Sequence, residues 1–189
     1  MDEKGIKKVL KTFGITFILL SIIELINVVL LWNSFFNLDG RKILFQELIL
    51  TSNIFPSYAK FLFLFLICSI CFFLIVGILH LKLTANLDLY DKSKPRQVLF
   101  LGVIVLAFSY IKLGYIIYFG SMRLNLKQPR TFLSAVYNSN IVPFYVTVIW
   151  VFFISVVCCY LMIGLFEGAG GLKWSMFLRD NETGDENES

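Results

Sequence analysis

The sequence predicts an all-α integral membrane protein with four transmembrane helices, built as two tandem two-helix repeats. Three observations lead to this prediction. The 189 residues are 58% hydrophobic and only 16% charged, which is too apolar for one soluble domain. Four apolar runs, at about 10–32, 60–82, 98–120 and 143–166, are each long enough to cross a hydrocarbon core about 30 Å thick. The third observation is an internal repeat.

The repeat is clearest in a motif that occurs twice, each time just before a long apolar run. Its residues are Ser52, Asn53, Pro56 and Tyr58 in the first copy, and Ser139, Asn140, Pro143 and Tyr145 in the second. From each motif onwards, 10 of 26 aligned positions are identical, where this composition gives about two by chance. The predicted repeats cover about 9–80 and 97–167 of a single membrane domain, 1–189, and residues 168–189 form a short cytoplasmic tail.

Lysine and arginine residues predict the orientation. With four spans, ten of them lie on the side of the N-terminus, the middle loop and the tail, and six lie on the other side. Because positive residues concentrate in cytoplasmic loops, both termini are predicted to be cytoplasmic. The net charge of +4 fits anionic lipid headgroups and does not call for a nucleic acid partner.

The first span follows a lysine-rich N-terminus that resembles the start of a secretory signal. Its apolar run is too long for a signal core, and no Ala-x-Ala-like site follows it, so we expect it to be retained. Gly14, Ser21 and Glu24 share one side of this helix, and Asn27 lies one turn further on. Small and polar residues on one face normally pack against protein rather than lipid.

Half-apolar segments follow the first and third spans, at 41–50 and 129–137. Both are too short to cross a membrane and are predicted to lie along its outer surface, the first as a short helix. The repeated motif comes next, and we interpret it as a helix start, because serine and asparagine cap helices and proline is tolerated in the first turn. A binding role for its asparagine and tyrosine is the alternative.

The second span carries Cys68, Cys71 and, at its inner end, His80. A polar loop at 84–96 separates the repeats, and the third span repeats the first with weaker identity, with Lys112 at the position of Glu24. The fourth span ends near Glu167, in register with His80, and the glycine-rich run 168–171 predicts a break in the helix.

Glu24 and Lys112 are the sharpest chemical feature, since ionisable residues inside spans are costly and usually face the interior of a bundle. A duplication with an even number of spans relates its halves by an axis along the membrane normal. Equivalent positions that face this axis also face each other. We therefore expect Glu24 and Lys112 to form an ion pair, supported by Asn27, Ser109 and Tyr115. The alternatives are that each charge reaches the membrane surface or another subunit, or that the residues line a water-filled pathway.

Other constellations are weaker. The four cysteines, Cys68, Cys71, Cys158 and Cys159, fall near the centre of their spans and none lies in a loop, so we interpret them as small apolar residues rather than a redox pair. His80 and Glu167 could meet as a pH-sensitive pair, but placement at the membrane surface is the simpler interpretation. No metal site, cofactor-binding motif, catalytic set or nucleic-acid motif is predicted.

These observations favour a non-enzymatic multi-pass membrane protein that acts by binding a partner within the bilayer, as an accessory or scaffold subunit. The partner would be another membrane protein or a second copy of this chain. A small channel or transporter with a polar path at Glu24 and Lys112 is the alternative. A membrane thiol oxidoreductase is a minor alternative, because it would need reactive cysteines near a surface.

Overall fold

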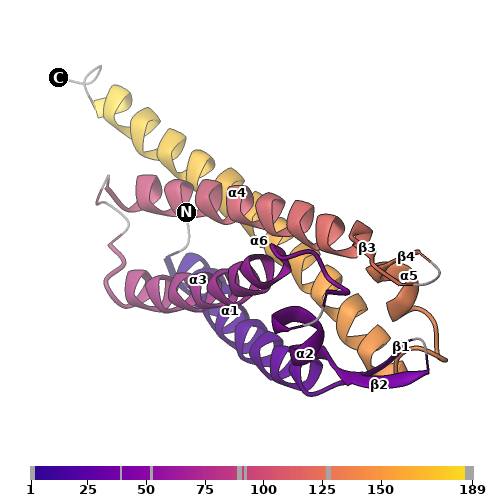
Figure 1. Cartoon of the computed structure of the whole chain (residues 1–189). Coiled ribbons are helices and arrows are strands. Elements are labelled where there is room, and N and C mark those ends of the chain that lie inside the picture. Colours follow the sequence, from indigo (N-terminus) through magenta and orange to yellow (C-terminus); the bar gives the residue numbers. More distant parts are fainter. Residues whose placement is uncertain are drawn as a thin grey trace. The chain divides into compact units, whose positions relative to one another are not determined.

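The computed structural model describes residues 3–38, 40–51, 53–88, 91, 93–126 and 129–185. This part of the chain is mostly helical (Figure 1). Its four long helices are α1 (Glu3–Trp32), α3 (Ala59–Ala85), α4 (Ser93–Ser121) and α6 (Phe144–Asp185). All four are long and apolar enough to span a membrane, which confirms that expectation.

The short elements lie between α1 and α3 and between α4 and α6. The first set is β1 (Phe35–Leu38), β2 (Arg41–Leu44) and α2 (Phe45–Leu50); the second is β3 (Arg123–Leu124), β4 (Arg130–Thr131) and α5 (Phe132–Val136). Each strand pair is antiparallel. The predicted helix over 41–50 is therefore wrong in its first part. Gly40, with φ of 79°, makes the turn of a hairpin, because a glycine adopts the left-handed conformation without steric cost.

The glycine-rich run does not break the last helix, so this prediction is also wrong. α6 continues to Asp185. The reason is close packing within the helix pair. A Cβ atom built at Gly171 would lie 2.7 Å from the backbone nitrogen of Leu99 in α4. The missing side chain brings the two backbones together, and the contact offsets the low helix propensity of glycine.

The contacts of the chain divide it into two compact units. Unit 1 comprises Met1–Leu19, Phe73–Tyr110 and Cys158–Ser189, and unit 2 comprises Leu20–Phe72 and Ile111–Val157. The N-terminal part of α1, the loop between α3 and α4 and the C-terminal part of α6 thus all belong to unit 1. All the strands, α2 and α5 belong to unit 2.

Unit 1 is held together by close helix crossings and a small apolar cluster. A Cβ atom at Gly77 of α3 would lie 2.9 Å from the carbonyl oxygen of Gly14 in α1. One at Gly102 of α4 would lie 2.6 Å from the backbone nitrogen of Gly168 in α6. The cluster contains Leu10, Leu83, Leu87, Val98 and Trp174, all buried. Small residues at crossings allow the close approach on which helix association in lipid depends.

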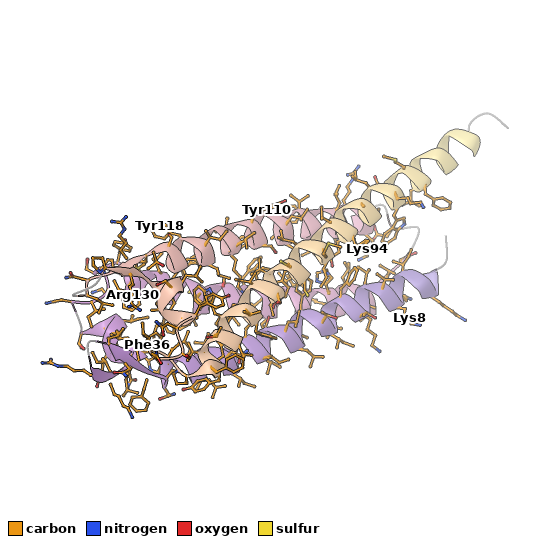
Figure 2. The ribbon with its side chains drawn as sticks, turned by 90° about the vertical axis from the view of Figure 1, so that its right-hand side faces the viewer. Lys8, Phe36, Lys94, Tyr110, Tyr118 and Arg130 are labelled. Carbon is orange, nitrogen blue, oxygen red and sulfur yellow. The ribbon has the colours of Figure 1, made fainter. Side chains whose placement is uncertain are left out.

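Unit 2 has an aromatic core. The ring of Phe132 lies 5.9 Å from that of Phe45, 5.0 Å from that of Phe119 and 5.3 Å from that of Trp150. Phe36 of β1 also stacks on Phe45 at 5.5 Å. Figure 2 shows Phe36 and Arg130 in the same region of this unit, where the strands lie. The strands and short helices bury aromatic side chains that the sequence alone placed along a membrane surface.

Candidate functional site

The first candidate site is the pair of Glu24 and Lys112 in unit 2. Glu24 projects from α1 and Lys112 from α4, and the Nζ atom donates a hydrogen bond to Oε1 over 2.6 Å. Both side chains have an exposed fraction of 0%. In a low-dielectric interior an ammonium and a carboxylate in direct contact stabilise each other's charged form, whereas either charge alone is costly. The structure thus brings together the two residues on which the sequence analysis concentrated.

The three supporting residues have other positions. Asn27 is half-buried on α1. Ser109 is buried in unit 1, where its hydroxyl donates to the carbonyl of Val105 over 2.7 Å, within α4. The Tyr115 ring lies 5.2 Å from that of Phe65 and belongs to the aromatic surroundings of a cavity of about 10 Å³. Ser109 and Tyr115 thus contact Val105 and Phe65, which are not members of the ion pair.

A second buried pair lies in unit 1. Nε2 of His80 in α3 lies 2.5 Å from Oε1 of Glu167 in α6, and the two side chains are 1% and 0% exposed. The interpretation of these residues as membrane-surface groups is therefore wrong. They are covered by aromatic packing: the ring of Phe17 in α1 lies 5.3 Å from the imidazole, and Phe73 of α3 stacks on Tyr160 of α6 at 3.9 Å. Their matching register in the two repeats was the signal that could have favoured the pair.

The contacts of His80 determine where its protons lie. Nδ1 is 2.7 Å from the carbonyl oxygen of Val76, which can only accept, so Nδ1 carries hydrogen. In a neutral ring Nε2 then carries a lone pair, which would repel a carboxylate oxygen at 2.5 Å. The contact is an ion pair when the imidazole is protonated, and among the described residues neither Nε2 nor Oε1 has a partner in hydrogen-bond geometry. The other carboxyl oxygen, Oε2 of Glu167, is buried without a hydrogen-bond partner among the described residues.

Both pairs join residues that correspond in the predicted repeats. Glu24 and Lys112 are 88 residues apart, and His80 and Glu167 are 87 apart. Two further contacts have the same spacing of 87. Phe73 stacks on Tyr160 at 3.9 Å in unit 1, and Phe45 lies 5.9 Å from Phe132 in unit 2.

The repeated motif connects segments of unit 2. The backbone N–H of Asn37 in β1 donates to the carbonyl of Ile141, inside the second copy, over 2.6 Å. The backbone N–H of Asn125, just after β3, donates to the carbonyl of Ile54, inside the first copy, over 2.8 Å. The donors are 88 residues apart and the acceptors 87. Each motif therefore accepts a hydrogen bond from the strand region of the other half.

The side chains of the motif lie at the surface of unit 2. Ser139, Asn140 and Pro143 are exposed and line a depression of about 440 Å³ together with Lys42. The side-chain amide of Asn125 lies 3.5 Å from the carbonyl of Asn53. α3 begins at Ala59, three residues after Pro56, and α6 begins at Phe144, directly after Pro143. Ser52 lies outside the described residues.

The tyrosines of the motif are also exposed. Tyr145 lies in the first turn of α6. Tyr58 precedes α3, and a hydrogen bond between its hydroxyl and that of Tyr118 raises the pKa of Tyr58, because the phenolate would lose that bond as a donor. Tyr118 is labelled in Figure 2.

The cysteines form no disulfide: all four are free and exposed on α3 and α6. Among the described residues there is no group of three or more metal-binding side chains.

No protein-family model, curated protein or solved structure matches the chain. The functional interpretation therefore depends on the contacts of the chain itself.

Proposed function

We propose that the chain is a non-enzymatic multi-pass membrane protein, made of two tandem two-helix repeats, that acts by binding a partner within the bilayer as an accessory or scaffold subunit. The observation that carries the proposal is the direct, fully covered contact between Glu24 and Lys112. A charged pair that is satisfied inside the protein has a structural role, and it leaves the apolar outer faces of the helices to meet other molecules.

The spacing of contacts supports the repeat arrangement. Residues related by a two-fold axis touch their own equivalents only where both lie on that axis. Contacts between residues 87 or 88 apart occur in unit 1 at His80 with Glu167 and in unit 2 at Glu24 with Lys112. A two-fold axis also generates contacts in reciprocal pairs, because equivalent residues make the same contact in opposite directions. The hydrogen bonds of Asn37 to Ile141 and of Asn125 to Ile54 are such a pair.

The distribution of side chains supports placement in a membrane. In the most apolar window of each long helix only 28% to 44% of the residues are buried within the protein. Large apolar residues such as Phe61, Phe100 and Phe166 are more than 60% exposed, while the charged groups of the spans at Glu24 and Lys112 are covered. This is the reverse of a soluble protein, and it suits lipid as the surrounding solvent. The excess of lysine and arginine favours a cytoplasmic location for the termini.

A small transporter is the second candidate, and one observation favours it. The buried carboxyl group of Glu167, with its second oxygen unpartnered among the described residues, is a group that can take up and release a proton next to His80. Carboxyl and imidazole groups in spans form proton relays in transporters. In this candidate, Glu24 and Lys112 would line the path of the substrate.

Purification from the native membrane separates the two candidates. A tagged chain is extracted in mild detergent, and its mass and co-purifying proteins are measured together. A stoichiometric membrane-protein partner is the expected result, whereas a homo-oligomer without another partner would favour the transporter. The same chain is then reconstituted in vesicles, where the double variant E24Q/K112M tests the transport candidate. A flux that the wild type carries and E24Q/K112M loses would overturn the structural role assigned to the pair.

A further inference from the structure

We propose that a groove between α1 and α6 in unit 1 binds an anionic phospholipid of the cytoplasmic leaflet, with an acyl chain in the groove and the phosphate at Lys173. This inference rests on the placement in a membrane and the orientation proposed above. It adds a defined ligand site to a protein whose other proposed contacts are with proteins.

The groove holds about 370 Å³. Ile6, Val9 and Phe13 form its wall on α1, and Phe166 forms part of the wall on α6. Two of the residues that line it, Gly5 and Gly170, are glycines. A Cβ atom built at Gly170 would meet no atom within 4 Å, so this glycine borders empty space rather than a packed helix.

The size of the groove favours a chain over a helix. An α-helix with side chains is about 10 Å across, so 370 Å³ would accommodate only about one turn of it. Concave apolar sites of about 300–1,000 Å³ are typical of small ligands. A single acyl chain is thin and apolar, and it can lie along Val9, Phe13 and Phe166.

Charge selects the headgroup. Lys173 lines the groove and is exposed, and the buried Trp174 beside it also lines it. Figure 2 shows two other lysines of unit 1, Lys8 and Lys94, near the ends of α1 and α4. A lysine near a membrane surface attracts an anionic phosphate by about 1 kcal/mol, and Lys173 supplies that charge at the groove.

One acidic residue also lines the groove and does not oppose this assignment. Glu167 contributes to the lining, but its side chain is 0% exposed and its carboxyl group lies against His80. A carboxyl group without exposed surface does not reach a ligand in the groove, and His80 at ion-pair distance can carry the compensating charge. Lys173 is therefore the charged group that the groove presents to a ligand.

The test uses the full chain in nanodiscs of equal parts phosphatidylglycerol and phosphatidylcholine. Native mass spectrometry after detergent release counts the lipids that stay bound. We expect one retained lipid, predominantly phosphatidylglycerol. G170F, which fills the groove, should abolish retention, and K173Q should lower the phosphatidylglycerol preference about fivefold. Two variants serve as matched controls and should behave as the wild type. G114F is at another glycine whose Cβ would meet nothing within 4 Å, and K11Q removes an exposed lysine that does not line the groove.

Three outcomes would overturn the proposal. One is equal lipid retention by G170F and the wild type. Another is a phosphatidylglycerol preference that K11Q lowers as much as K173Q, since the charge would then act over the surface generally. The third is a dimer that G170F dissociates, which would assign the groove to a second copy. Helical content by circular dichroism and elution volume confirm that each variant is folded. Co-purification of a partner is measured separately, so the loss of either proposal leaves the other testable.

Discussion

Breaking the Glu24–Lys112 pair should destabilise the protein strongly, and restoring it in reverse should rescue the protein. At the observed 2.6 Å, the attraction is about 6 kcal/mol for an effective dielectric constant of about 20. Desolvation of the two ions offsets much of this energy, so the net contribution of the pair is small. Removing one partner is different, because the other charge then lacks its opposite charge in a covered site. E24Q and K112M should each lower the free energy of unfolding by about 3–5 kcal/mol.

A double-mutant cycle distinguishes the pair from two independent effects. E24Q/K112M should be much less destabilised than the sum of the single variants, with a coupling energy of about 2–3 kcal/mol. Ordinary polar contacts in membrane proteins contribute about 0.6 kcal/mol on average, so the expected coupling is well separated from them. The charge-reversed variant E24K/K112E should recover most of the wild-type stability, because the two positions face each other.

The assay is reversible unfolding by dodecyl sulfate in mixed micelles, followed by tryptophan fluorescence. Lys94 and Asp91 provide the control cycle. They are 3.6 Å apart, with side chains 17% and 39% exposed, so solvent screens them and their coupling should not be measurable. If the Glu24–Lys112 coupling is also indistinguishable from zero, or if E24K/K112E is less stable than both single variants, the two charges are not paired and the structural role of the pair is refuted.

Three further predictions follow from local geometry. G77A should destabilise the protein and weaken the α1–α3 contact, because the added Cβ would lie 2.9 Å from a backbone oxygen. The control G114A faces open space and should leave the unfolding midpoint unchanged or raise it. Equal midpoints for the two variants would show that the α1–α3 crossing is loosely packed. His80 is the only histidine in the chain, so nitrogen NMR of labelled histidine should show one imidazole, with a protonated Nδ1. E167Q should change the Nε2 signal, and an unchanged signal would mean that His80 and Glu167 are not in contact. Hydrogen bonds from the hydroxyl and backbone N–H of Ser93 lower the pKa of Asp91 in the folded protein. The stabilising effect of Asp91 is therefore complete above its unfolded pKa, near 4, and is lost as the pH falls through the lower folded pKa. D91N should remove this part of the pH dependence of unfolding, and a pH profile identical to that of the wild type would contradict the assignment.

Much of the architecture could be read from the chain. Runs of apolar residues dictate long helices because a helix satisfies every backbone hydrogen bond by itself, and the observed helices include the four predicted runs. The weaker repeat of the first span in the third aligns Glu24 with Lys112, 88 residues apart, so the location of one polar pair could be predicted. The position and apolar character of each helix depend on neighbouring residues in the sequence, so the sequence pattern can predict them.

The positions of the short strands could not be predicted in this way. β1, β2, β3 and β4 are two to four residues long, too short to show an alternating pattern. The core of unit 2 decides their form, because rings such as Phe36 and Phe132 are buried against others that are distant in the sequence. A half-apolar segment has the same composition on a membrane surface and in an aromatic core, and only its neighbours distinguish the two.

The sequence by itself determined the four apolar helices, and it predicts a correspondence between the two halves of the chain. Only the tertiary structure decided that α6 continues through its glycines and that His80 and Glu167 meet in a covered site. Glycine is a helix breaker in water, where its backbone freedom is costly, but at Gly171 it permits a contact of backbones that no larger residue allows. Similarly, an ionisable residue near the end of a span can face the membrane surface or the protein interior. The choice depends on whether a partner such as Glu167 lies within reach, and this distance exists only in the folded molecule.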